Sequence, residues 1–259
     1  VAFLVVGLPG ILIALLVRFT VSEPPRGYSE ALVHEVPPPP FWAVVRFLFA
    51  SPVLRNVVIA GTLTAFAGYA SVIWVPIYLV RIHEMGTGEA GTYLALTLGV
   101  GGAIGIYLGG RIADHLGKKY GEHWLAWLVA IVGLISVPFM LLCFFAETAE
   151  TAILAYAIPA FLGTIYVACG FALIQNHTPL EMRSVCAAIN LFILNIIGLG
   201  LGPFSIGLLS DLFEPSVGQD SLRYGLLATL VAIVLGCWYY YRTGAFILRT
   251  RDRAIVSSL

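Results

Sequence analysis

The sequence predicts an all-α membrane protein, a bundle of six transmembrane helices preceded by the end of one further helix. Of its 259 residues, 59% are hydrophobic and 11% are charged, and the mean hydropathy is +0.94. Soluble domains carry about 25% charged residues, so this composition excludes an ordinary water-soluble fold. The apolar residues also form runs of about 20 or more, the length that a helix needs to cross a bilayer. These runs are 52–82, 91–110, 123–146, 151–175, 185–209 and 222–241.

A further apolar run, residues 1–17, opens the chain. Neither a Met nor a charged segment precedes it, so it does not fit a secretory signal peptide. We expect it to be the last part of a helix whose beginning is missing. The chain then divides into four parts, namely the end of that helix (1–19), a cytoplasmic linker (20–50), the six-helix bundle (51–246) and a cytoplasmic tail (247–259).

The linker has two features of its own. Pro37 to Pro40 form a stiff, extended stretch. Residues 41–49 mix aromatic and aliphatic side chains with Arg46, a pattern typical of a short helix that lies in the membrane interface. The alternative is an early start of the span that follows.

The basic residues are distributed very unevenly over the predicted connections. If successive connections alternate sides, twelve of the 14 fall on one side and two, Arg81 and Arg223, on the other. Cytoplasmic loops carry such an excess of Lys and Arg. We therefore expect a multi-pass protein of the plasma (inner) membrane, with the 18–55 connection and the C-terminus in the cytoplasm. The twelve are Arg18, Arg26, Arg46, Arg55, Arg111, Lys118, Lys119, Arg183, Arg242, Arg249, Arg251 and Arg253.

The span 52–82 carries a polar stripe. At about 100° per residue, its members share one sector of the helix. Polar side chains that face lipid are unfavourable, so the stripe predicts a helix that lines a substrate cavity. The alternative is that its hydroxyls bond to carbonyls of their own helix. The stripe consists of Thr64, Gly68, Ser71, Trp74 and Tyr78.

Glycines in the span 91–110 indicate close helix packing. Gly101, Gly105 and Gly109 recur every four residues, and small residues at this spacing let two helix backbones approach. The span 185–209 repeats the pattern with Gly198 and Gly202, on a face shared with Asn195.

Two asparagines and a proline-containing span complete the candidate cavity residues. Asn190 and Asn195 are each expected either to bond a neighbouring helix or to line a substrate path. The span 151–175 contains Pro159 and Gly163, which predict a broken or bent helix of the kind found beside transporter binding sites. Tyr166, on the same span, joins Trp74 and Tyr78 as a candidate aromatic lining.

The sequence offers no pattern for catalysis or for a cofactor. The four cysteines and five histidines are scattered without the spacing of a metal site, and no acid, base and nucleophile converge as they do in enzymes. We expect no enzyme activity, no cofactor, no bound metal and no nucleic-acid partner. No Asp, Glu, Lys or Arg lies in the middle of a complete span, so any proton-coupling residue would have to lie elsewhere.

The decapeptide Gly110-Arg-Ile-Ala-Asp-His-Leu-Gly-Lys-Lys119 resembles the loop signature of the major facilitator superfamily, approximately G-x-x-x-D-[RK]-x-G-[RK]-[RK]. His115 departs from it. The resemblance implies the C-terminal half of a transporter of six plus six helices, with the decapeptide as a cytoplasmic loop. It also implies that Asp114 latches the cytoplasmic side in one conformation, whereas the basic residues bind headgroups or only set topology. The motif residues are Gly110, Arg111, Asp114, Gly117, Lys118 and Lys119.

Three further stretches are similar to Spinster-like members of that superfamily, namely 2–10, 74–81 and 183–211. Animal members of this group are associated with export of sphingosine-1-phosphate and lysophospholipids. The resemblance implies a secondary transporter that moves an amphipathic or lipid-like molecule by alternating access.

Alternating access needs two bundles around a shared site. The expected partners are therefore membrane lipids, the substrate and an N-terminal six-helix half of the same transporter. Proton coupling stays open, and two alternatives remain. One is a drug or organic-anion exporter of the same superfamily, and the other is a half-length accessory membrane protein without transport activity of its own.

Overall fold

The computed structural model describes residues 2–22 and 39–257, in which all regular structure is helical. The chain divides into two units, Val1–Pro38 and Pro39–Leu259. The first contains α1 (Ala2–Thr20), an apolar helix in which Thr20 Oγ1 donates to the Leu16 carbonyl at 2.6 Å. Residues 23–38, which hold most of the predicted linker, lie outside the described residues.

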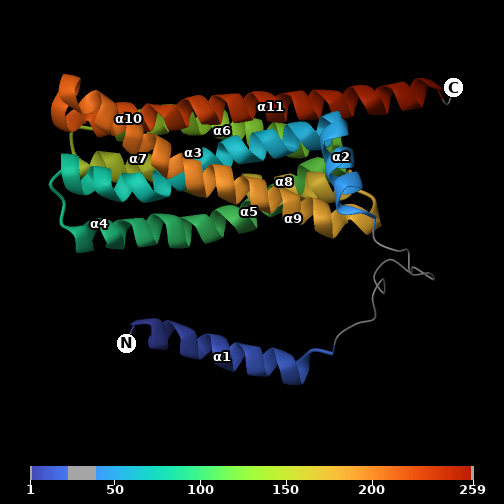
Figure 1. The fold of residues 1–259 in the computed structure, drawn as a ribbon, viewed down its shortest axis with the longest axis horizontal. Coiled ribbons are helices and arrows are strands. Elements are labelled where there is room, and N and C mark those ends of the chain that lie inside the picture. The colour runs from blue at the N-terminus through green and yellow to red at the C-terminus, as the bar shows by residue number, and fades with distance from the viewer. Residues whose placement is uncertain (1, 23–38, 258–259) are drawn as a thin grey trace. The chain divides into compact units, whose positions relative to one another are not determined.

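The second unit is a bundle of long helices that run back and forth along one axis (Figure 1). Two of its legs contain a π-helical stretch, and a third is interrupted. Its elements are α2 (Phe41–Ala50), α3 (Pro52–Ile82), α4 (Thr87–Leu94), η2 (Ala95–Gly101), α5 (Gly102–Tyr120), α6 (His123–Phe144), α7 (Ala149–Leu162), α8 (Ile165–Asn176), η3 (Leu180–Met182), α9 (Arg183–Ile193), η4 (Leu194–Leu201), α10 (Gly202–Val217), η5 (Gly218–Asp220) and α11 (Ser221–Ser257).

Five segments of the described chain are long and apolar enough to cross a membrane. The fifth, Leu180–Asp252, has 73 residues, far more than the roughly 20 that one crossing needs. It folds back on itself at Gly218, whose φ is 60°, and the Ser210 and Ser221 hydroxyls meet at 3.2 Å across the turn. The bundle therefore has six legs of membrane length, as the sequence predicts.

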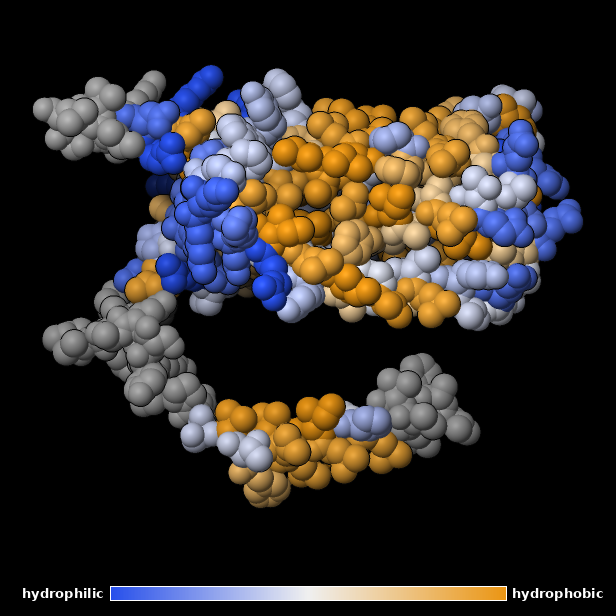
Figure 2. Space-filling model, turned by 180° about the vertical axis from the view of Figure 1, so that it is seen from behind, coloured by the Kyte–Doolittle hydropathy of each residue, from blue (hydrophilic) through white to orange (hydrophobic). Residues whose placement is uncertain are grey.

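The bundle carries its charges at its two ends. A hydrophobic band separates two hydrophilic ends in the space-filling view (Figure 2). We call one of them the basic end; there α5, α8 and α11 finish, and α3, α6 and α9 begin. Which side of the membrane it faces stays a prediction. Its basic residues include Arg46, Arg55, Arg111, Lys118, Lys119, Arg183, Arg242, Arg249, Arg251 and Arg253.

The short helix predicted at 41–49 is present as α2. It belongs to the bundle unit and contacts α3 and α9. Val44 and Leu48 are fully buried there, whereas Phe41 and Trp42 are exposed. The helix is therefore amphipathic and docked by its apolar face, and its position in the membrane interface remains a prediction.

The helix ends depend on capping residues and backbone hydrogen bonds more than on where an apolar run ends. α3 begins where expected, because Ser51 Oγ accepts from the Leu54 N–H at 3.4 Å and Pro52 occupies the first turn. The predicted cytoplasmic tail begins at 247, and the structure shows that α11 continues as helix through 257; that this segment lies in the cytoplasm stays a prediction. A helix satisfies its own backbone groups outside lipid as well as inside it, so the end of an apolar run does not end the helix.

Glycine packing joins α5 to the interrupted leg. A Cβ added at Gly105 would collide with the Phe161 carbonyl and the Thr164 hydroxyl, and one added at Gly109 would lie 2.6 Å from Ile165 Cγ1. Gly101 faces open space instead. The wider π-helical turn of η2 ends at this residue and shifts the register. The predicted close approach is thus confirmed at Gly105 and Gly109 but not at Gly101.

Candidate substrate-binding site

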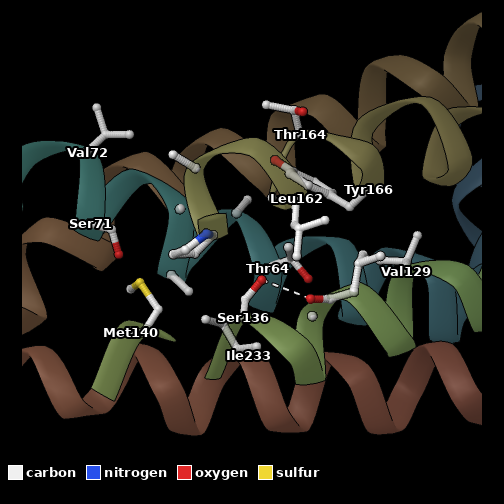
Figure 3. A pocket seen from close by; sticks show the side chains of 18 of the residues that line it. Thr64, Ser71, Val72, Val129, Ser136, Met140, Leu162, Thr164, Tyr166 and Ile233 are labelled. Carbon is white, nitrogen blue, oxygen red and sulfur yellow. Dashed lines mark hydrogen bonds between the residues drawn. The ribbon is translucent and has the colours of Figure 1, made fainter. Parts of the chain in front are cut away.

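A cavity in the bundle has a volume of about 290 Å³. We call it the principal cavity. Its walls come from α3, η2, α6, α7, α8 and α11, and Figure 3 shows side chains from several of these helices around one space. It lies where the apolar core of the basic end meets that of the opposite end, since Val129 belongs to the first and Met140 to the second.

The interrupted leg contributes one wall of this cavity. α7 ends at Leu162 and α8 begins at Ile165, which confirms the predicted break. Pro159 lines the cavity and lies inside α7, where its ring removes a backbone donor. Irregular backbone at membrane depth is tolerated where it lines a cavity or is buried in protein.

The principal cavity is largely apolar and none of its lining residues is charged. Three of its hydroxyls bond carbonyls of their own segment. Thr64 donates to Ala60 at 2.9 Å, and Ser136 and Thr164 make equivalent bonds to Val132 and Phe161. Among the described residues, Ser71 Oγ is buried without a partner, and in Figure 3 Ser71 lies on the α3 wall.

A second, smaller cavity of about 120 Å³ adjoins the first. The two share Tyr69, Tyr166 and Val167 as lining residues. The smaller one is also lined by Asn190, Asn195 and Tyr240. The Tyr240 hydroxyl is buried and has no hydrogen-bond partner in the described part of the chain. We call this space the amide cavity.

The structure brings together most of the residues predicted to line a cavity. Thr64 and Ser71 line the principal cavity, Asn190 and Asn195 line the amide cavity, and Tyr166 lines both. Asn190 is 4% exposed. Asn195 Nδ2 donates to the Leu191 carbonyl at 2.8 Å, so part of its polarity is satisfied within its own leg.

Trp74 and Tyr78 lie elsewhere on the same stripe. Trp74 Nε1 donates to the Pro203 carbonyl at 2.8 Å and so joins α3 to α10. The Tyr78 hydroxyl lies 3.0 Å from the Cys143 carbonyl and 3.1 Å from that of Phe144, at the end of α6. Neither residue lines the two cavities. Their polar hydrogens are directed to carbonyls of neighbouring helices.

Sequence reasoning missed several lining residues. Tyr69 lies just off the predicted stripe, and Ser136 and Thr164 lie beside Gly133 and Gly163 in otherwise apolar runs. Tyr240 is hidden within a run of aromatics near the end of the last span. A polar residue next to a small one in an apolar helix was the available indication, but ordinary helix packing produces the same pattern.

The decapeptide 110–119 was predicted to be a loop, and this is wrong. It forms the last turns of α5, and the connection to α6 is only Gly121 and Glu122. Gly121 has φ 107°, a conformation that favours glycine after a helix. The basic side chains of Lys118 and Lys119 suit the negative end of the helix dipole, which explains why a charged segment stays helical.

The motif side chains lie largely on the surface of the basic end. Gly117 packs against Leu125, and Gly110 faces open space. Arg111 Nη1 donates to the Tyr107 hydroxyl at 3.0 Å. Asp114 is exposed and has no ion-pair partner among the described residues. Its role as a latch therefore remains a prediction that needs a group outside this bundle.

An ion pair links two connections at the basic end. Glu122 Oε2 lies 3.4 Å from His177 Nε2. The neighbouring His177 side chain outweighs the effect of burial and holds the pKa of Glu122 below its usual value of 4.5. The pair ties the α5–α6 connection to the end of α8.

We expect this pair to make stability pH-dependent. A folded-state pKa below the unfolded value stabilises the fold above about pH 4.5 and loses that contribution as the pH falls through the folded pKa. Thermal unfolding midpoints measured from about pH 3 to pH 6 should fall with acid more steeply for the natural protein than for Glu122→Gln. Equal slopes in the two proteins would contradict this assignment.

The described residues contain no cluster of His, Cys, Asp and Glu that could hold a metal ion. Cys143, Cys169, Cys186 and Cys237 are free thiols buried in the bundle. At the end opposite the basic end, Arg81 pairs with Glu214 at 3.2 Å and Arg223 with Asp220 at 3.0 Å.

Comparison with known proteins places these features in a family. Residues 1–203 match the model of the Major Facilitator Superfamily. The chain is 33% identical over 180 residues to an MFS-type efflux pump of Mycolicibacterium smegmatis, covering 69% of this chain and 42% of that protein. It is 26% identical over 269 residues to the sphingosine-1-phosphate transporter SPNS2 of Danio rerio, covering 95% of this chain and 52% of the relative.

A solved structure shares the fold. It is that of a bacterial homologue of the human lysosomal transporter Spinster, inward-facing and unoccupied, with a TM-score of 0.74 and 24% identity. The match covers 96% of this chain and 59% of the other, and the chain spans about half the length of the two curated relatives. The similarity to Spinster-like transporters and the prediction that the protein is not an enzyme are thereby confirmed. The chain belongs to the Major Facilitator Superfamily.

Proposed function

We propose that this chain is one bundle of a secondary transporter that moves an amphipathic or lipid-like molecule by alternating access. The N-terminal six-helix half of the same transporter would supply the other bundle. The observation that carries this proposal is the position of the irregular backbone. The break between α7 and α8, Leu98 of η2, and Leu194 and Asn195 of η4 all line one of the two adjoining cavities.

Discontinuous helices beside a cavity are typical of transporter binding sites, because freed backbone groups and weakened turns allow movement there. The apolar lining and the lack of charged residues suit a lipid-like substrate better than a sugar, which needs more amides and carboxylates. A relative named for sphingosine-1-phosphate transport supports the same class.

Coupling and orientation complete the proposal. The described cavities contain no ionisable carboxylate or basic side chain, so proton coupling would use residues of the other half. We place the basic end in the cytoplasm, in a plasma (inner) membrane, because of the excess of Lys and Arg there.

The test is transport of a fluorescent lysophospholipid by the whole protein in proteoliposomes. The proposal expects uptake or release above that of protein-free vesicles, with saturation at rising lipid concentration. Binding without transport, or no difference from empty vesicles for any lysolipid, would overturn it in favour of an accessory membrane protein.

Asp114→Asn tests the latch in the same assay. Removing the charge would cost the charge-assisted bonds that Asp114 is proposed to make in one conformation, about 1.5–3 kcal/mol. We expect the transport rate to fall about tenfold or more. Glu89→Gln, an exposed carboxylate at the other end of the same leg, should transport normally. Equal rates for the two variants would remove Asp114 from the mechanism.

A second candidate is export of drugs, favoured by the similarity to the efflux pump of Mycolicibacterium smegmatis. The two candidates differ in the molecules that compete for transport. Inhibition of lysolipid transport by unlabelled lysolipids alone supports the lipid substrate. Inhibition by structurally unrelated drugs with no response to lysolipids supports the exporter.

A further inference from the structure

The two cavities differ in chemistry although they share a wall. The principal cavity is about 290 Å³ and the amide cavity about 120 Å³. Around the larger space, the hydroxyls of Thr64, Ser136 and Thr164 donate to carbonyls of their own segments and are not available to a ligand. Ser71 Oγ is the exception on the α3 wall, since it is buried without a partner among the described residues. What the principal cavity otherwise offers to a ligand is mainly hydrocarbon, from side chains such as Val132, Leu162 and Ile233.

The amide cavity offers hydrogen bonds instead. Asn190 is buried and faces this space from α9, and no hydrogen bond engages its amide in the described residues. Tyr240 also lines this space and is 1% exposed, and its hydroxyl lacks a partner in the described part of the chain. A buried phenol or amide without a partner costs about 1–3 kcal/mol, so a ligand that bonds to it is favoured.

The two cavities lie on either side of a shared aromatic wall. Tyr69 comes from α3 and Tyr166 from α8, and each lines both cavities. Both rings also carry a hydroxyl, so the shared wall is aromatic with polar tips. A molecule that fills both spaces must carry a polar group next to a slender apolar part.

We infer that the principal cavity binds the alkyl chain of a single-chain amphiphile, and that the amide cavity binds the uncharged polar group next to that chain. An ester, amide or hydroxyl has the chemistry to pair with Asn190 and Tyr240. Neither cavity has a charged residue, so a phosphate or ammonium group would lie beyond this bundle's site. The inference rests on the proposed function and names the part of the substrate that this bundle recognises.

Such a site selects chain length by shape. An alkyl chain in a bilayer is already out of water, so each added methylene gains little on entering the cavity. A chain too long for the cavity overpacks it and binds more weakly. We therefore expect a length limit, beyond which affinity falls about tenfold, rather than a steady increase with length.

The test uses the whole protein in nanodiscs and a monoacylglycerol whose chain ends in a photoreactive diazirine. Unmodified monoacylglycerols of increasing chain length compete at equal mole fraction in the bilayer, which cancels their partition into lipid. Adducts are mapped by mass spectrometry. We expect competed adducts on Val129, Val132 and Ile233, with competition lost above a limiting length.

A cavity-filling variant sharpens the test. Ala160→Leu adds three carbons to the wall of the principal cavity, so the limiting chain length should shorten by about three carbons. Ala157→Leu makes the same change on the same helix at a residue that does not line the cavity, and it should leave the limit unchanged. Asn190→Leu should weaken competition by monoacylglycerols several-fold relative to methyl-capped analogues of the same length.

Adducts confined to outward-facing residues such as Leu134, Ile135 and Leu142 would overturn the inference. So would equal length limits in the two leucine variants. These results are separate from those of the transport assay. Competed labelling of the cavity without lysolipid transport would sustain the inference and refute the proposed function, whereas transport with no labelling of the cavity would do the reverse.

Discussion

Gly105→Ala should destabilise the bundle severely, by about 3 kcal/mol or more, although it adds one methyl group. The new Cβ would collide with the Phe161 carbonyl and the Thr164 hydroxyl. Phe161 contributes a backbone atom, so α5 and the interrupted leg must move apart for the methyl group to fit. A membrane bundle depends on close packing between helices, because lipid supplies no hydrophobic force to hold them together.

Gly101→Ala is the matched control. It adds the same methyl group in the same leg, where nothing lies within 4 Å. Replacing a helical glycine with alanine stabilises by roughly 0.5–1 kcal/mol when the space is open. The two variants should therefore shift the thermal unfolding midpoint of the purified protein in opposite directions. Shifts of the same sign and size would mean that α5 and the α7–α8 break do not pack as described.

Tyr78→Phe is the second change with a large expected effect. The phenol is fully buried, and its oxygen lies within hydrogen-bond distance of the Cys143 and Phe144 carbonyls and of His83 Nε2. The last carbonyls of a helix lack partners within the helix. The Ala146 N–H already donates to the Cys143 carbonyl at 3.4 Å, so the Tyr78 hydroxyl matters most for the Phe144 carbonyl and His83 Nε2. Removing the hydroxyl deprives these buried groups of this partner, which costs about 1–3 kcal/mol.

Thermal unfolding also checks this second prediction, with Tyr93→Phe as its control. Tyr93 is 43% exposed and its hydroxyl makes no hydrogen bond in the described residues, so its removal should change stability by less than about 0.5 kcal/mol. A Tyr78→Phe protein as stable as the control would show that water or another group replaces the phenol at the end of α6.

The legs could be predicted from sequence because bilayer thickness and proline chemistry act locally. The first complete leg begins at Pro52 and ends at Ile82, as the apolar run predicts. Pro159 and Gly163 likewise mark the break between α7 and α8 within a few residues. By contrast, the decapeptide beginning at Gly110 was predicted to be a loop because it is charged. Low hydropathy indicates that a segment lies outside the lipid, but it does not indicate whether the backbone is helical.

The candidate site was only partly predictable, because it depends on how legs rotate against one another. Periodicity placed Thr64, Ser71 and Trp74 on one face of α3. It could not show that this face meets an open space near Thr64 but the Pro203 carbonyl near Trp74. Tyr69, off that face, lines both cavities because α8 and η4 approach from its side.

The burial of every thiol in this chain has a practical consequence for following its movements. Cysteine reacts as an accessible thiolate, and Cys143, Cys169, Cys186 and Cys237 are all 5% exposed or less. The natural chain thus already provides a nearly silent background for thiol-specific dyes and spin labels. A single cysteine placed at Lys118 or at Asp211, on opposite ends of the bundle, would be the dominant labelled position of this chain, and a probe there would report movement at that end of the bundle.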